Sequence, residues 1–339
     1  MARKSPIPEF LAPGDKIAVV SPSFGALGAW PHRAEKGLAY LHSLGLEVEV
    51  MPNARRNDSW VSASAEERAD DLHRAFADPD VKLILCGIGG NHTNQVLTHL
   101  DFDLIGSNPK WLQGYSDITV LQYALMKRCG MPSFYGPALV SEMGEHPEVL
   151  AYTDRWLRAA WFGTEPLKFE PTESWTEEFL DWDTQEDLQR PRKMEPSEGW
   201  VTINEGSATG PVVGGCLETI CWHLKGQADW VQPEEALFFF ETSEEVPSPA
   251  HVDAYLTDLE QLGVFGSCAG LLVGRPRGYS AEERSALWEL VARYARRYSL
   301  PALGNIDCAH TDPMLTLPLG VSAALDASGR SLVIDLSGP

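Results

Sequence analysis

The sequence predicts an α/β fold in two domains: an N-terminal doubly wound parallel-sheet domain and a smaller, C-terminal mixed α/β domain rich in strands. The chain has 339 residues, which is more than one hydrophobic core usually holds. In the first half, short runs of apolar and β-branched residues alternate with amphipathic stretches, as in parallel sheets with crossover helices. A long polar segment rich in Trp, Glu, Asp and Pro then separates the halves. We therefore expect domains at 1–165 and 206–339, connected by a loop at 166–205.

The first half is expected to begin with a regular alternation of strands and helices. A strand at 16–21 (KIAVVS) and a helix at 34–44 lead to a strand at 47–51, and a helix at 65–76 leads to a strand at 81–86. Ligand sites in such sheets form at the carboxyl ends of the strands. The segments that directly follow the strands are therefore where we expect functional side chains.

The second half shows apolar runs at wider intervals, together with two long amphipathic stretches. This pattern favours a mixed α/β domain over a second doubly wound one. Strands are expected at 210–213, 236–241, 270–273 and 332–334, and helices at 250–262 and 281–298.

Composition and charge exclude several classes of partner. The chain is 44% hydrophobic and 22% charged, which is typical of a globular protein. Its 48 acidic and 27 basic residues leave a net charge of −21, which repels nucleic-acid backbones and anionic membrane surfaces. Pro8 and Pro13 interrupt what would be the apolar core of an export signal, and no apolar run is long enough to span a bilayer. We expect a cytoplasmic protein that binds neither nucleic acid polymers nor membranes.

The six cysteines are scattered and include no C-x-x-C pair. Most lie beside apolar residues, which indicates buried thiols in a reducing compartment. We therefore expect neither a disulfide framework nor a metal site. Cys308 is an exception worth testing because it lies close to His310 in the sequence.

Ser116 is the candidate nucleophile. It lies on the turn of GYSDIT, between an expected strand at 111–115 and an expected helix at 117–129. This arrangement places a hydroxyl at a helix N-terminus, where the backbone N–H of Asp117 can stabilise an oxyanion. The turn resembles a nucleophile elbow but lacks the second glycine of G-x-S-x-G. A plain N-cap role for the hydroxyl is therefore an equal alternative on local sequence.

A serine nucleophile needs a histidine base and a carboxylate that orients it. His310 is favoured over the other eight histidines because it lies in a polar loop, NIDCAHTDP, that follows a strand-like run. Glu241 ends the apolar run ALFFF and would be delivered to a strand end, with Glu244 and Glu245 as competing candidates. A solvated, structural role for Glu241 is the alternative.

A glycine-rich segment, GIGGNHTN at 87–94, follows another expected strand. Backbone N–H groups of Gly89 or Gly90 can complete an oxyanion hole or hold a substrate carboxylate. The spacing is not that of a dinucleotide fingerprint, and no P-loop lysine follows. A nicotinamide dehydrogenase is therefore strongly disfavoured.

Taken together, six segments resemble the LD-carboxypeptidase family, and within it the microcin C immunity branch. They are APGDKIAVVSPS, GIGGNHTNQVL, GYSDITVLQYAL with FYGPAL, GPVVGGCLETI, FFFETSEE and NIDCAHTDPMLTLPLGV. The resemblance implies a Ser-Glu-His triad on Ser116, Glu241 and His310, a site where the two domains meet, no cofactor or metal, and a homodimer. One departure is that Cys216 and Glu218 replace the asparagines of the family's GGNLNT.

The long connecting loop also resembles the immunity branch. In that branch an aromatic residue of the loop stacks on the nucleotide base of the substrate, and Trp182 matches its position. Trp175 is expected to assist, and Arg190 of the same loop is expected to contact the substrate.

The function expected from this resemblance is hydrolysis of an amide or acyl bond in a small carboxylate-bearing peptide or an aminoacyl or peptidyl nucleotide. Ser116 would attack, His310 would be the base, Glu241 would hold the imidazole tautomer, and N–H groups of Asp117 and Gly89 or Gly90 would form the oxyanion hole. Two alternatives stay open. One is a murein tetrapeptide LD-carboxypeptidase of cell-wall recycling, and the other is a non-catalytic protein that binds a small ligand.

Overall fold

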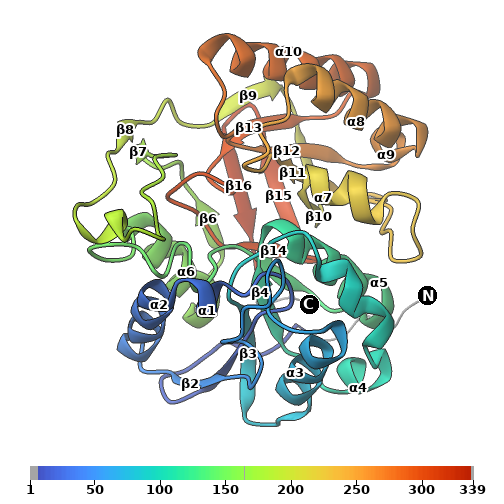
Figure 1. Cartoon of the computed structure of the whole chain (residues 1–339). Helices are drawn as coiled ribbons and strands as arrows, with labels where there is room; N and C mark the ends of the chain where they lie inside the picture. Colours follow the sequence, from blue (N-terminus) through green and yellow to red (C-terminus); the bar gives the residue numbers. More distant parts are fainter. Residues whose placement is uncertain (1–6, 164, 337–339) are drawn as a thin grey trace. The chain divides into compact units, whose positions relative to one another are not determined.

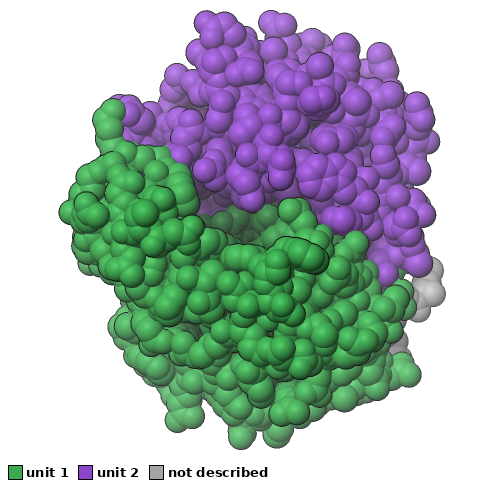
Figure 2. Space-filling model, in the orientation of Figure 1, with its two compact units in different colours: residues 1–164, 178–193, 315–317 green, residues 165–177, 194–314, 318–339 purple. Residues whose placement is uncertain are grey.

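The computed structural model describes residues 7–163 and 165–336. The chain divides into two compact units, which are coloured separately in Figure 2. Unit 1 consists of Met1–Thr164, Glu178–Lys193 and Leu315–Leu317, and unit 2 of Glu165–Glu177, Met194–Met314 and Pro318–Pro339. The connecting segment therefore contributes to both units, with 178–193 belonging to the first.

Unit 1 is built on a six-stranded sheet with the order β14-β5-β4-β3-β1-β2. The first five strands in sequence pair in parallel, and β1 lies between β2 and β3, so the strand order reverses there. In Figure 1, helices α1, α2 and α6 lie on one side of the sheet, and α3, α4 and α5 on the other. This is the doubly wound domain that the sequence predicts. The strands are β1 (Lys16–Val20), β2 (Glu47–Val50), β3 (Val81–Cys86), β4 (Trp111–Gly114), β5 (Ser133–Tyr135) and β14 (Leu317–Leu319).

Local sequence signals fix the ends of the helices of unit 1. Ser64 and Glu67 form a reciprocal capping box at the start of α3, and Pro31 occupies the first turn of α2. Gly130 ends α5 in the left-handed conformation, with φ of 67°. The helices are α1 (Ala26–Ala29), α2 (Pro31–Ser43), α3 (Ala65–Ala77), α4 (Phe102–Ser107), α5 (Thr119–Cys129) and α6 (Ala151–Phe162).

Unit 2 is built on an eight-stranded mixed sheet with the order β6-β16-β15-β10-β11-β12-β13-β9. Strands β10 to β13 pair in parallel, and the flanking strands are antiparallel. The mixed, strand-rich C-terminal domain is therefore confirmed. The strands are β6 (Leu167–Phe169), β9 (Val201–Asn204), β10 (Ser207–Cys216), β11 (Leu237–Glu241), β12 (Gly270–Gly274), β13 (Ala302–Ile306), β15 (Ser322–Asp326) and β16 (Ser331–Ile334).

The helices of unit 2 are amphipathic. Helix α10 (Ala281–Tyr298) buries Leu287, Val291 and Ala295 and begins with a capping box between Ser280 and Glu283. It packs beside α8 (Pro249–Gln261) and α9 (Val264–Ser267), as Figure 1 shows. Within residues 7–163 and 165–336, no helix is both long and apolar enough to cross a membrane.

The connecting segment is more structured than the sequence indicates. It contains β6 and β9 of the second sheet and a small antiparallel pair, β7 (Ser174–Trp175) with β8 (Glu195–Pro196). A short 3₁₀ turn covers Glu186–Leu188. These elements are two to four residues long, so no periodicity is available to predict them.

The close approach of β10 and β11 generates a prediction about stability. A Cβ atom added at Gly214 would overlap the carbonyl oxygen of Phe239, so this pairing requires glycine. Gly214→Ala is expected to lower the free energy of unfolding by about 3 kcal/mol or more, because the two strands must move apart. Calorimetry or chemical denaturation measures the loss.

Gly266 is the matched control in the same unit. It lies in α9, and the nearest atom to an added Cβ is Tyr298 Cε1 at 3.9 Å. Gly266→Ala should leave stability unchanged or raise it by up to about 1 kcal/mol. Equal effects of the two changes would show that the β10–β11 contact is not the cause.

Candidate functional site

Ser116 has a backbone conformation that non-glycine residues rarely adopt. Strand β4 ends at Gly114, Tyr115 is extended, and Ser116 has φ of 62° before a 3₁₀ turn at Ser116–Ile118 leads into α5. Such a conformation costs on the order of 1–3 kcal/mol and is concentrated at functional sites. The structure therefore has a strand, a strained turn and a helix, as the sequence suggested, but α5 begins two residues later than expected.

The hydroxyl of Ser116 does not cap a helix. The N-cap positions of the 3₁₀ turn and of α5 are Tyr115 and Ile118, and neither makes a side-chain capping bond. Among the residues that the structure describes, Ser116 Oγ has no hydrogen-bond partner, whereas its backbone N–H donates to Tyr135 Oη at 3.2 Å. The simple N-cap role that the sequence left open is therefore not the one observed.

The carboxylate of Asp117 joins the loops that follow three strands of the sheet. Its Oδ2 accepts hydrogen bonds from Ser23 Oγ at 2.6 Å and from the backbone N–H groups of His92 at 2.8 Å and Thr93 at 2.7 Å. Asp117 is fully buried. Sequence reasoning assigned a role to its N–H group and missed its side chain, although an acidic residue next to the serine was a signal for it.

Gly89 lies directly beside the candidate nucleophile. A Cβ atom at this position would be 2.8 Å from Ser116 Cβ and 3.3 Å from the backbone nitrogen of Asp117, so a side chain has no room there. Gly90 has φ of 140° and packs against Ser23 and Phe24. The structure thus brings together Ser116, Asp117, Gly89 and Gly90, all in unit 1.

In unit 2 the structure pairs Glu241 with His310. Glu241 is the last residue of β11 and is 1% exposed, and its Oε2 accepts from the backbone N–H of His310 at 3.2 Å. The same oxygen lies 2.8 Å from Nδ1 of the ring. Because an ionised carboxylate only accepts hydrogen bonds, this contact assigns the proton to Nδ1. Glu241 is therefore not the solvated residue of the alternative hypothesis.

The electrostatic surroundings of His310 favour its charged form. Burial lowers its pKa, but the charge of Glu241, the hydrogen bond to it and the charges of Glu244 and Glu218 raise the pKa to about 9. Glu244, whose side chain is 59% exposed, places Oε2 3.1 Å from Nε2 of the ring. The ring nitrogen opposite Glu241 therefore has a carboxylate beside it.

Glu218 is a buried acid that the sequence analysis noted only as a departure from the family motif. Its Oε1 accepts from the backbone N–H of Ser243 at 2.9 Å and from its hydroxyl at 2.7 Å. Burial and the nearby charge of Glu241 raise the pKa of Glu218. The residue thus holds the turn that directly follows Glu241.

Cys308 does not have the surroundings of a nucleophile. Burial, with the charges of Glu241 and Asp307, raises the pKa of its thiol well above the ordinary value, which suppresses the thiolate. All six cysteines lie in the described part of the chain, are buried and form no disulfide. No group of three His, Cys, Asp or Glu side chains within 7–163 and 165–336 is arranged to hold a metal ion.

Trp182 belongs to unit 1, where aromatic and cationic side chains surround its ring. The ring meets Trp30 edge-on with centroids 4.9 Å apart, and the guanidinium of Arg33 lies over it at 4.2 Å. Arg33 in turn donates to Asp187 Oδ2 at 2.7 Å, which fixes the loop. The indole is half-buried, so part of its ring remains exposed.

The other two residues expected to contact substrate, Arg190 and Trp175, belong to different units. Arg190, in unit 1, makes a paired contact with Glu178 through Nη1 at 2.9 Å and Nη2 at 2.8 Å, and this contact lowers the pKa of Glu178 to about 2. Trp175, in unit 2, lies beside Arg275, whose guanidinium carbon is 5.1 Å from the ring centroid. Their assignment to substrate binding stays a prediction.

Relatives with known names match almost the whole chain. Putative carboxypeptidase YocD of Bacillus subtilis is 31% identical, with 95% of this chain and 97% of that protein covered. The microcin C7 self-immunity protein MccF of Escherichia coli is 29% identical, with 96% and 94% covered. A probable murein peptide carboxypeptidase of Bacillus subtilis is 28% identical, with 97% and 94% covered.

Solved structures agree with these relatives. An MccF-like protein from Bacillus anthracis matches with a TM-score of 0.89 and 31% identity, covering 97% of this chain and 99% of that one. MccF in complex with aspartyl sulfamoyl adenosine matches with a TM-score of 0.88 and 28% identity, covering 98% of both chains. The models of the LD-carboxypeptidase N-terminal and C-terminal domains match residues 17–136 and 209–325. The chain belongs to the LD-carboxypeptidase family.

Proposed function

We propose that the chain is a serine peptidase of the microcin C immunity type, in which Ser116, His310 and Glu241 form the catalytic triad. The observation that carries the proposal is the Glu241–His310 hydrogen bond of 2.8 Å, because it assigns Nδ1 to the carboxylate and leaves Nε2, which Glu244 approaches at 3.1 Å, as the nitrogen that accepts a proton from a serine. The strained backbone of Ser116 supports the nucleophile assignment. A cytoplasmic location and a homodimer belong to the same proposal.

In the proposed mechanism, His310 Nε2 takes the proton of Ser116 Oγ as this oxygen attacks the acyl carbon of the substrate. Glu241 keeps the proton on Nδ1 and stabilises the imidazolium. N–H groups of Asp117 and of Gly89 or Gly90 donate to the oxyanion. The imidazolium then protonates the leaving group, and water hydrolyses the acyl-enzyme with His310 again as the base.

The proposed substrates are small, carboxylate-bearing peptides or aminoacyl nucleotides. Two related structures support the nucleotide class, since they hold aspartyl sulfamoyl adenosine and, in a protein from Streptococcus pneumoniae, AMP. The half-buried ring of Trp182 supplies an aromatic surface for a base. A murein tetrapeptide carboxypeptidase is the second candidate, favoured by the probable murein peptide carboxypeptidase among the relatives. Incubation with a sulfamoyl aspartyl-adenylate and with a murein tetrapeptide, followed by mass spectrometry, separates the two.

Removing the nucleophile tests the triad. Ser116→Ala is expected to lower turnover at least ~10³-fold while the fold persists, because binding and oxyanion contacts survive the change. His310→Ala should be comparably damaging. The double variant should be hardly worse than either single one, because the residues act as a unit. Steady-state kinetics of the three variants measure these losses. Losses that multiply independently in the double variant would contradict a triad. Inertness of the wild-type protein toward a fluorophosphonate probe would contradict it as well.

The raised pKa of His310 predicts an alkaline activity profile. A general base acts in its neutral form, and kcat/KM reports the pKa of that base in the enzyme without substrate. We therefore expect kcat/KM to rise with pH up to about 9, the pKa of His310. Glu244→Gln removes a charge that raises this pKa, so the rising limb should move to lower pH.

Glu245→Gln is the matched control, because it removes a neighbouring acid that makes no ion pair with the ring among the described residues. Its profile should coincide with that of the wild type. A limb that stays in place in Glu244→Gln, or moves equally in both variants, would rule out Glu244 as a charge that tunes the base.

Trp182 separates the two substrate classes. Stacking of a base on an aromatic ring contributes about 1 to 3 kcal/mol, so Trp182→Ala should raise KM for an aminoacyl-adenylate analogue about 5- to 150-fold. A murein peptide offers no base, and its KM should change little. Equal losses on both substrates with a lower melting temperature would assign the ring to packing against Trp30 and favour the murein candidate.

A further inference from the structure

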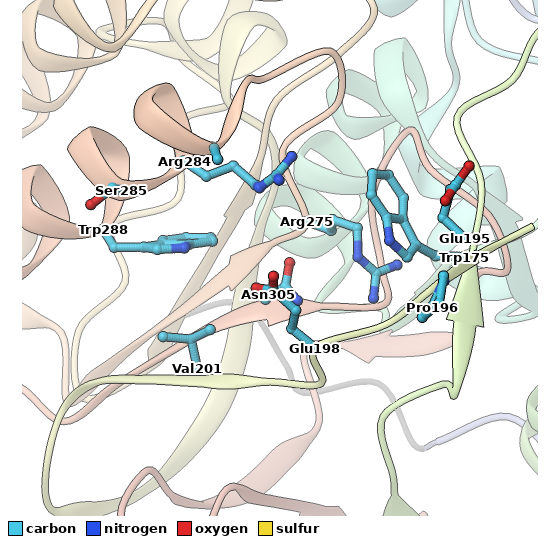
Figure 3. Close-up of a pocket in the computed structure, with 11 residues that line it drawn as sticks. Trp175, Glu195, Pro196, Glu198, Val201, Arg275, Arg284, Ser285, Trp288 and Asn305 are labelled. Carbon is cyan, nitrogen blue, oxygen red and sulfur yellow. The ribbon is translucent and has the colours of Figure 1, made fainter.

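Unit 2 contains a pocket of about 480 Å³, shown in Figure 3, that is lined by Trp175 but by none of the three residues of the proposed triad. This volume lies within the range of sites that hold small molecules. The pocket is enclosed by the β7–β8 pair, the residues that follow β8, the ends of β12 and β13, and the first turns of α10. The residues that line it and carry the argument are Trp175, Glu198, Arg275, Arg284, Trp288 and Asn305.

Arg275 is a buried cation with unused donors. It is 1% exposed, and Nη2 contacts both Asp307 and Ser197 Oγ. Its Nε and Nη1 have no hydrogen-bond partner among the described residues. A buried N–H group without a partner costs about 1–3 kcal/mol and calls for an explanation such as a ligand. The unused donors and the pocket that the residue lines together indicate an acceptor from outside the chain.

The wall of the pocket carries charges of both signs. Arg284 lines the pocket, and its Nη1 donates to the carbonyl of Tyr279 at 2.7 Å. This hydrogen bond holds the guanidinium group at the pocket wall. The exposed carboxylate of Glu198 has no hydrogen bond or ion pair to any described residue. Two arginines, Arg275 and Arg284, and two glutamates, Glu195 and Glu198, line the pocket, so the charges on its wall balance. A ligand that carries both a carboxylate and an ammonium group matches this wall better than a simple anion.

Two indole rings supply apolar surface. In Figure 3, Trp288 and Trp175 lie on opposite sides of the pocket, with Arg284, Asn305 and Glu198 between them. Trp175 is held by its stacking against the Arg275 guanidinium and by its place in the β7–β8 pair. Both rings are half-buried, so part of each remains available for contact. Such surfaces suit an apolar or aromatic side chain.

We propose that this pocket binds a short peptide zwitterion, of about dipeptide size, with an apolar side chain. The carboxylate is held by Arg284 and Arg275, the ammonium group by Glu198, and the side chain lies between Trp175 and Trp288. This binding does not depend on the role proposed for Ser116.

Calorimetry on the full-length Ser116→Ala protein tests the proposal without turnover. The probes are alanyl-phenylalanine, its N-acetyl form, which lacks the ammonium group, and its C-terminal amide, which lacks the carboxylate. The free dipeptide is expected to bind, and each capped form should bind about ten- to a hundredfold more weakly, because each loses a charge-assisted hydrogen bond.

Two variants in the same background assign the contacts. Arg284→Ala should weaken the free dipeptide while leaving the amide unaffected, and Glu198→Gln should weaken it while leaving the N-acetyl form unaffected. Arg296→Ala, an exposed arginine further along α10 that does not line the pocket, should bind all three probes as the parent does. Arg275→Lys is a third test of the carboxylate contact and should also weaken the free dipeptide. Its melting temperature is recorded as well, because Arg275 forms the buried ion pair with Asp307.

Absence of binding by the free dipeptide would overturn the proposal. So would binding that Arg284→Ala and Glu198→Gln leave unchanged, since it would place the peptide elsewhere on the protein. Loss of affinity that is equal for the free and capped probes would show that the pocket does not read the two charges. A catalytically active Ser116→Ala protein would refute the triad but leave these binding results intact.

Discussion

The hydrogen bonds to the carboxylate of Asp117 are the constraint on which the arrangement around Ser116 depends. A parallel sheet brings the carboxyl ends of its strands to one edge, but it does not determine how the following loops fold. One buried oxygen accepts from the loop after β1 and from the loop after β3, and its own residue belongs to the turn after β4. Three segments that are distant in sequence are therefore tied to the residue next to the serine. The strained φ of Ser116 persists because this surrounding structure over-determines it.

In unit 2, the carboxylate of Glu241 fixes His310 as the carboxylate of Asp117 fixes the loops around Ser116. It accepts two hydrogen bonds from one residue, His310, through the backbone N–H and the ring, so the position and the tautomer of the imidazole are fixed together. The close contact of β10 with β11 at Gly214 places Glu241, and Ser243 links the turn after it to Glu218. Three carboxylates near one imidazole explain why its pKa is raised despite burial.

The sequence predicts the fold where the elements are long and regular. Strand β3 and helix α10 have the predicted bounds, because their apolar patterns are continuous and their ends carry Gly87 and the Ser280–Glu283 capping box. The short strands β6 to β9 escape prediction because they are held by tertiary pairing and have no period of their own. The same reason applies to the site. Ser116 and Gly89 can be chosen from turn chemistry, whereas the Asp117 side-chain contacts and the Glu244–His310 contact arise only from folding.

The connecting segment shows how one stretch of chain can serve two units. Residues 178–193 are fixed to unit 1 by the buried ion pair of Arg33 with Asp187, at 2.7 Å, and by Trp182 packed on the same guanidinium. The residues just before them are held by unit 2, because Thr176 pairs through both backbone groups with Asp312, two residues after His310. Trp175, a wall of the pocket, is therefore next to a residue that is hydrogen-bonded to the loop of the proposed base. A peptide bound against Trp175 would therefore lie one residue away from the backbone pair of Thr176 and Asp312, which joins the connecting segment to the loop of His310.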